Sequence, residues 1–268
     1  GPGSGGVVAG TFAIVENNGS KVVDDMILRC DAAMKVAFGE NPRDFGRHGK
    51  QPNTRASVAF LLRKCLSDAQ DYKARREEAT KEGKPFRRDL GLEQMARVLD
   101  GELPLKAHAH RADDITTSIR IAREFGVRMT LDHCTEGHLI ADFLAKAGYP
   151  AIVGPSFGSK SKYELKNKSF ETVPALVKAG MLVSITTDHN VHPQESLILF
   201  AAMARKAGLS EADALRCITC NAAEILGIGD HKGSILPELD ADLVIWNGHP
   251  LELQTTATHV FVRGMRVL

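Results

Sequence analysis

The sequence has no long hydrophobic run and almost no net charge, and each absence excludes a class of protein. No apolar segment approaches the ~20 residues that a membrane-spanning helix requires, so no membrane partner is expected. The 34 basic and 33 acidic side chains leave a formal net charge of +1, which argues against a nucleic-acid partner. No glycine-rich phosphate loop follows an apolar run, which argues against a phosphate-binding α/β protein.

Cysteine is also scarce, and the five that are present give an odd number without a dense framework. This usage predicts free thiols in a reducing, cytoplasmic compartment. Cys217 and Cys220 have the spacing C-x-x-C, but they fall in an expected helix and the sequence has no second such pair. We therefore expect two core-facing thiols there rather than a redox or zinc motif.

The first six residues contain no methionine, and they lack the charged and apolar regions of a signal peptide. We expect either an expression remnant or a break inside a longer protein. The 268 residues suffice for one large α/β domain with a full core.

Short apolar runs alternate with helical patterns from residue 103 onwards. The expected strands are 103–109, 127–133, 150–154 and 181–187, and the helices that follow them are 112–125, 136–147, 171–179 and 194–207. Such alternation predicts βαβ units and a parallel sheet. Two earlier strands (7–15 and 33–40, the second ended by Asn41-Pro42), an amphipathic helix over 54–82 that Thr54 would cap, and a helix over 90–100 precede this region.

The C-terminal part has a different pattern, in which short strands are separated by turn residues. The expected strands there are 233–235, 241–246 and 259–268, which predict a small antiparallel β unit.

Three of the apolar runs end in side chains that bind metals or move protons. His108 and His110 end one run, His133 ends the next, and Asp188 with His189 ends a later one. Buried strand ends have no structural need for imidazole or carboxylate groups, and burying them without partners is costly. Several strands that bring such residues to one rim form the usual active site of an α/β barrel or sheet.

The residue types in these clusters favour a metal-dependent hydrolase. His108 and His110 alternate along one strand and face the same side, and neutral imidazole is a common ligand of zinc and similar metals. The mixed set of histidine and aspartate suits Zn²⁺, Mn²⁺, Fe²⁺ or Ni²⁺. Asp188 is the expected proton acceptor for water that such an ion activates. A single histidine at a strand end is usually an ordinary polar residue, and His110 and His189 could support the ligands rather than bind metal.

Two further charged residues lie on the early strand. Lys35 stands in an apolar run, where a lysine must reach a partner. Glu40 precedes Asn41 and Pro42 and could be a turn residue.

Seven segments together resemble the metal-dependent amidohydrolase superfamily, in its imidazolonepropionase-like branch. These segments are residues 2–4 with Gly10, 34–42, 107–115, 132–138, 186–189, 218–227, and 233–235 with 240–246. The resemblance covers nearly the whole chain. It implies a TIM-like (β/α)8 barrel, incomplete at its N-terminus, over residues 1–229 and part of an accessory β-sandwich over 230–268.

The resemblance also implies roles for the residues singled out above. His108, His133 and Asp188 would be metal ligands, and Asp188 would also move protons. Lys35 would be the carbamylated lysine that bridges two metals in many relatives, with Glu40 as the competing candidate. The cofactor would be one or two divalent ions, most simply zinc, and His133 and His110 would polarise a substrate carbonyl while His189 contacts the substrate.

The implied activity is hydrolysis of a C–N bond in a small amide, cyclic amide or imine-like molecule by metal-activated hydroxide. The family's first His-x-His motif has no counterpart here, because His108 and His110 precede His133 by only one βα unit. We therefore expect a chain that begins near the family's second strand. The alternative is a catalytically incompetent barrel remnant that folds and pairs with a second copy. Lysines of the loop 154–162 could meet an acidic substrate group.

Overall fold

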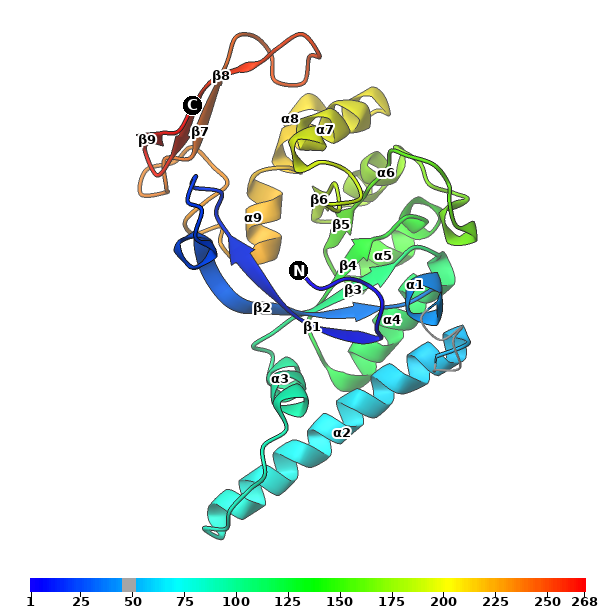
Figure 1. The fold of residues 1–268 in the computed structure, drawn as a ribbon. Coiled ribbons are helices and arrows are strands. Elements are labelled where there is room, and N and C mark those ends of the chain that lie inside the picture. The colour runs from blue at the N-terminus through cyan, green and yellow to red at the C-terminus, as the bar shows by residue number, and fades with distance from the viewer. Residues whose placement is uncertain (45–51) are drawn as a thin grey trace. The chain divides into compact units, whose positions relative to one another are not determined.

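The computed structural model describes residues 1–44 and 52–268 (Figure 1). Tertiary contacts divide the chain into two compact units. Unit 1 comprises residues 1–13 and 29–132, and unit 2 comprises residues 14–28 and 133–268.

The larger sheet has six strands, and their order in the sheet is their order in the sequence. These strands are β1 (Val8–Val15), β2 (Ile27–Ala37), β3 (Leu105–Ala109), β4 (Met129–His133), β5 (Ala151–Val153) and β6 (Val183–Ile185). The pairs β2/β3 and β5/β6 are parallel, with Val36 opposite Ala107 and Ile152 opposite Ser184. The predicted α/β fold is therefore confirmed.

The helices of unit 1 pack against one another, and the last of them also packs against β3. They are α1 (Glu40–Asp44), α2 (Arg55–Lys81), α3 (Leu90–Leu99) and α4 (Ala112–Phe125). Thr54 caps α2 as predicted, because its hydroxyl accepts the backbone N–H of Ser57 and the Ser57 side chain accepts that of Thr54. Leu62 and Leu66 of α2 are fully buried, as is Tyr72, whose hydroxyl donates to Glu93 of α3.

Unit 2 contains most of the short helical elements. They are η1 (Val23–Met26), η3 (Gly137–Ile140), α5 (Ala141–Ala147), η4 (Tyr163–Leu165), α6 (Thr172–Lys178), η5 (Gln194–Ser196), α7 (Leu197–Lys206), α8 (Glu211–Arg216) and α9 (Cys220–Leu226). The predicted helix over 136–147 is thus a 3-10 turn followed by an α-helix. Ile140, the last residue of η3, has φ −134° and ψ 28°, outside the α-helical range, so the 3-10 turn ends there and α5 begins at Ala141.

The C-terminal strands form a separate antiparallel sheet in the order β7 (Leu243–Trp246), β8 (Ala257–Val262) and β9 (Met265–Arg266). The predicted strand over 233–235 is wrong. Gly233 there has φ 98°, and a Cβ on it would lie 2.7 Å from the Ala223 side chain, so the segment packs as a turn against α9. The predicted domain boundary at residue 229 stays a prediction.

Among the described residues, no helix is both long enough and apolar enough to cross a membrane.

Candidate metal and proton-transfer site

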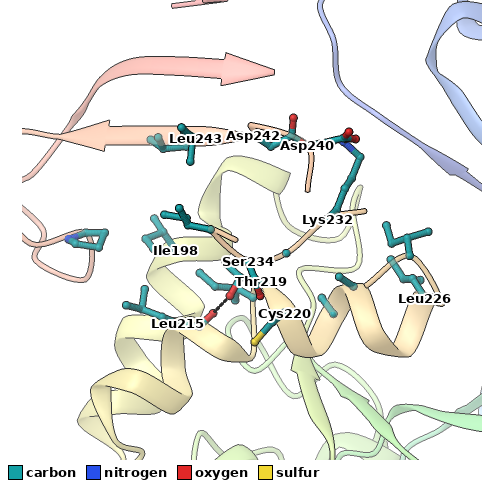
Figure 2. A pocket seen from close by; sticks show the side chains of 18 of the residues that line it. Ile198, Leu215, Thr219, Cys220, Leu226, Lys232, Ser234, Asp240, Asp242 and Leu243 are labelled. Atoms are coloured by element: carbon teal, nitrogen blue, oxygen red, sulfur yellow. Dashed lines mark hydrogen bonds and ion pairs between the residues drawn. The ribbon is translucent and has the colours of Figure 1, made fainter. Parts of the chain in front are cut away.

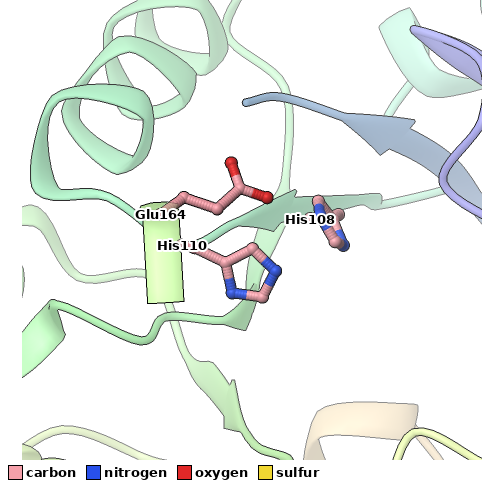
Figure 3. Close-up of side chains that lie close together, drawn as sticks. All are labelled: His108, His110 and Glu164. Atoms are coloured by element: carbon pink, nitrogen blue, oxygen red, sulfur yellow. The ribbon is translucent and has the colours of Figure 1, made fainter. Parts of the chain in front are cut away.

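Unit 1 contains one sheet face that is lined by buried polar side chains. In the parallel register of β2 and β3, Lys35 lies opposite Lys106 and Ala37 opposite His108, so these residues face the same side. His110 follows two residues after His108, and the two imidazole rings meet edge to face with centroids 4.6 Å apart (Figure 3). Lys35, Lys106, His108 and His110 are all at most 9% exposed. The predicted cluster at the end of β3 therefore lies on one buried face.

The ammonium group of Lys106 is held by partners from two other strands. Its Nζ lies 3.1 Å from Oδ1 of Asp132 and 3.5 Å from the hydroxyl of Thr130, both on β4. The Thr130 hydroxyl itself donates to Asp132 at 2.8 Å. The Phe12 ring of β1 lies beneath both lysines, with its centroid 5.3 Å from Nζ of Lys106 and 5.8 Å from Nζ of Lys35.

A hydroxyl from the start of the chain reaches His108. The Ser4 Oγ lies 3.0 Å from Nδ1 of the ring. His108 is 3% exposed, so a partly buried hydrogen bond orients an imidazole whose residue type suits a metal ligand.

In unit 2, one hydrogen bond fixes the tautomer of His133. Its Nδ1 lies 2.6 Å from the backbone carbonyl oxygen of Gly154. A carbonyl oxygen only accepts, so Nδ1 carries the proton and, in the neutral ring, Nε2 carries the lone pair. This arrangement, with Nδ1–H on a carbonyl, is the one usually found for histidines that bind metals through Nε2.

The backbone is strained at the predicted residues of unit 2. His133 has φ 68°, Cys134 has φ 45° and Asp188 has φ 53°, all in the left-handed region. Residues other than glycine adopt this region rarely, at a cost of order 1–3 kcal/mol each, and such strain concentrates at functional sites. The Asp188 amide donates to the Thr186 hydroxyl at 3.1 Å. Asp188 is half-buried, whereas the neighbouring His189 is exposed.

The long loop between β5 and α6 uses its lysines internally. Lys168 donates to the carbonyl oxygens of Phe157 and Ser159, and Lys160 donates to that of Lys166. Burial, followed by the nearby Lys160, lowers the pKa of Lys168. The described geometry therefore gives these lysines a structural role within the loop.

The same loop carries a carboxylate that the sequence patterns did not reveal. Glu164, the third side chain in Figure 3, is the middle residue of η4 in unit 2 and is fully buried. A glutamate in a polar, lysine-rich loop is normally solvated, so only its burial identifies it as a candidate ligand. Glu136, at the start of the predicted helix over 136–147, is also buried and accepts a hydrogen bond from Asn167 at 2.8 Å.

The thiols take no visible part in this chemistry. No two of the five cysteines, all in described residues, form a disulfide. Burial raises the pKa of the Cys217 thiol to about 12, so it stays protonated near neutral pH. Cys134 packs beneath Gly137, where a Cβ would lie 2.7 Å from its sulfur.

Three carboxylates of unit 2 lie close enough together to bind a metal ion, but the ammonium group of a lysine already lies among them. Carboxylate oxygens of Glu16, Asp240 and Asp242 lie within 4.8 Å of one another. The Lys232 ammonium is bonded to all three, at 2.5, 2.9 and 2.5 Å respectively. This lysine neutralises the cluster, which therefore serves to tie the segment 230–242 to Glu16.

A large apolar pocket lies beside this network. It has a volume of about 730 Å³ and is lined by residues of α8, α9 and β7, among them Leu215, Leu226 and Leu243 (Figure 2). Lys232 and Asp240 stand at its polar end. None of the predicted metal or proton-transfer residues lines it.

Comparison with known proteins places the chain in a class. Residues 104–267 match the model of the amidohydrolase family. The chain therefore belongs to the amidohydrolase family, and the predicted resemblance is confirmed.

Individual members of the family are similar to different lengths of this chain. The structure of an amidohydrolase from Thermotoga maritima MSB8 superposes with a TM-score of 0.96 at 40% identity, over 100% of this chain and 70% of that chain. An imidazolonepropionase of Paracidovorax citrulli is 35% identical over 54% of this chain and 34% of its own length. The amidohydrolase tasK of Hapsidospora irregularis is 25% identical over 86% of this chain and 25% of its own length. The chain thus spans about a quarter to a third of these two curated relatives.

Proposed function

We propose that this chain supplies metal-binding and proton-transfer residues to a hydrolase that cleaves C–N bonds in small molecules. The observation that carries the proposal is the pair His133 and Asp188. His133 ends β4 and Asp188 follows β6, both in the left-handed conformation, and His133 has its Nε2 lone pair set by the bond to Gly154. Membership of the amidohydrolase family supports the same reaction class.

The proposed ligands are His108, Lys35, His133 and Asp188. Lys35 is preferred to Glu40, because Lys35 lies buried on the same sheet face as His108 while Glu40 begins α1 and is half-buried. Imidazole and carboxylate donors suit zinc, which we take as the preferred ion.

The chemistry of the remaining steps follows from the side chains. A bound divalent ion would supply Lewis acidity and make water available as a nucleophile at neutral pH. The Asp188 carboxylate would accept a proton from the attacking water and pass it to the leaving nitrogen. His110 and His189 would contact the substrate. A cyclic amide is the preferred substrate class, since the matching relatives include imidazolonepropionases.

The test combines metal analysis with hydrolysis. The purified chain, equilibrated with stoichiometric zinc and then desalted, should retain zinc and hydrolyse a five-membered cyclic amide such as hydantoin or an imidazolone. His108→Ala and Asp188→Asn should lose bound zinc and at least 100-fold in rate. The exposed neighbours His231 and Asp230 provide matched controls as His231→Ala and Asp230→Asn. Absence of zinc and manganese from the unaltered chain would favour the incompetent remnant instead.

A further inference from the structure

Two residues of unit 2, Gly154 and Thr186, connect the strand ends that carry His133 and Asp188. Gly154 follows β5, and Thr186 follows β6 directly. The Thr186 amide donates to the carbonyl oxygen of Val153 at 2.9 Å, which extends the pairing of the two strands by one bond. The two residues therefore sit side by side at the point where both strands end.

Gly154 and Thr186 are packed too closely for any other residue at position 154. A Cβ on Gly154 would lie 2.1 Å from the Thr186 carbonyl oxygen, a distance that real Cβ atoms do not show. Gly154 also has φ 135°, which side chains disfavour. Its own carbonyl oxygen accepts Nδ1–H of His133 at 2.6 Å. The close approach thus fixes the acceptor that sets the His133 tautomer.

Thr186 supports the backbone at Asp188, beyond the end of β6. Its hydroxyl accepts the Asp188 amide at 3.1 Å. Asp188 is left-handed at φ 53°, a conformation that needs support from its surroundings. The hydroxyl supplies that support with a bond that valine, of the same shape, could not form.

We infer that Gly154 and Thr186 are positioning residues, which together set the donor atom of His133 and the backbone of Asp188. The role of both residues rests on the proposed function, because they support the proposed ligands His133 and Asp188. Their contacts are packing and hydrogen bonds that do not depend on that function. Neither residue is expected to touch the substrate.

Two signals of the metal-free protein test this geometry directly. The first is the Nδ1–H proton of His133, seen by NMR in protein with ¹⁵N-labelled histidine and assigned with His133→Gln. The second is solvent exchange of the Asp188 amide. Gly154→Ala should abolish the first signal, whereas Gly180→Ala should keep it, because Gly180 has φ 85° and open space around its Cβ position.

The variants at Thr186 test the contribution of its hydroxyl group alone. Thr186→Val should speed exchange of the Asp188 amide at least tenfold, and Thr186→Ser should restore it. Thr187→Val changes the adjacent buried threonine and should leave exchange unaltered. Zinc affinity, measured against a competing chelator, should fall at least tenfold in Thr186→Val and Gly154→Ala and recover in Thr186→Ser.

The inference is overturned by a persistent His133 signal in Gly154→Ala, by slow Asp188 exchange in Thr186→Val, or by unchanged zinc affinity in both variants. Failure of the unaltered chain to bind zinc would instead defeat the proposed function. The imidazole and amide signals need no metal, so they would still decide the inference.

Discussion

Two lysine-centred ion networks, one in each unit, differ in the groups that surround the ammonium. Lys106 in unit 1 meets one carboxylate, one hydroxyl and an aromatic ring, and both it and Asp132 are buried. Lys232 in unit 2 meets three carboxylates, two of which are about one-third exposed. Arg263 also reaches Glu16 in that network, at 3.1 Å.

The two networks have different roles in the protein. Lys232 joins segments that are far apart in sequence, and its bonds to Asp240, Asp242 and Glu16 raise its pKa above the ordinary value despite the opposing effect of its partial burial. Lys106 lies on the sheet face that carries His108, where an apolar pair would fold as well. A buried pair of this kind is weak evidence for stability and stronger evidence for a requirement of the neighbouring site.

The largest expected effect comes from removing the buried lysine. Lys106→Met leaves the Asp132 carboxylate buried with Thr130 and should cost about 3–5 kcal/mol in the free energy of unfolding. Adding Asp132→Leu should recover most of that loss, because the pair is then replaced by apolar groups. Urea unfolding at pH 7 measures both. A double variant as unstable as Lys106→Met would contradict the argument.

Removing the other lysine should cost less. Lys232→Met should lower the free energy of unfolding by about 2 kcal/mol, because charged hydrogen bonds are lost while Arg263 still pairs with Glu16. The same urea titration applies. A loss equal to that of Lys106→Met would show that the exposure of Asp240 and Asp242 and the remaining Arg263 pair do not limit the loss.

The pH dependence of the Lys232 effect follows from its partners. The hydrogen bond from Lys232 lowers the pKa of Asp240 below its ordinary 3.8, so this stabilisation is present above that pH and is lost as the pH falls through the lowered value. The raised pKa of Lys232 contributes stability below 10.5 that is lost at still higher pH. The difference between the unaltered chain and Lys232→Met should therefore be constant from pH 5 to 9 and shrink below pH 4. A difference that grows in acid would contradict this sign.

The smallest effect is expected at an exposed pair. Lys64 and Asp68 lie one turn apart on α2 with 2.5 Å between charged atoms, and both side chains are well exposed. Lys64→Met should leave the urea midpoint unchanged within error, because solvent screens such pairs. A clear loss would mean that contact distance, rather than burial, determines the strength of the pairs compared above.

Local patterns predicted much of the fold and only part of the site. The alternation of apolar runs and helical patterns predicted β3 to β6, and Thr54 marked the start of α2, because hydrophobic periodicity and capping act within a few residues. The strand over 233–235 was wrong because packing of Gly233 against α9 decides that segment. Such packing depends on residues that are distant in sequence.

The same distinction applies to site residues. His108, His133 and Asp188 are predicted as site residues from the sequence because their types are unusual at the ends of apolar runs. Gly154 and Thr186 could not be identified, since a glycine and a threonine in a loop are common. Only the structure shows that Gly154 packs against the Thr186 carbonyl oxygen. Glu164 was missed for a similar reason, because its burial comes from tertiary packing.

The chain contains a single tryptophan, Trp246, on β7 of unit 2. Indole fluorescence therefore reports on unit 2 alone, whereas the 27 residues of α2 give unit 1 a large share of the far-ultraviolet circular dichroism. Unfolding curves recorded with both probes would coincide if the units melt as one cooperative block and would separate otherwise. The position of Trp246 thus makes it possible to test, without any added label, whether the two units unfold cooperatively.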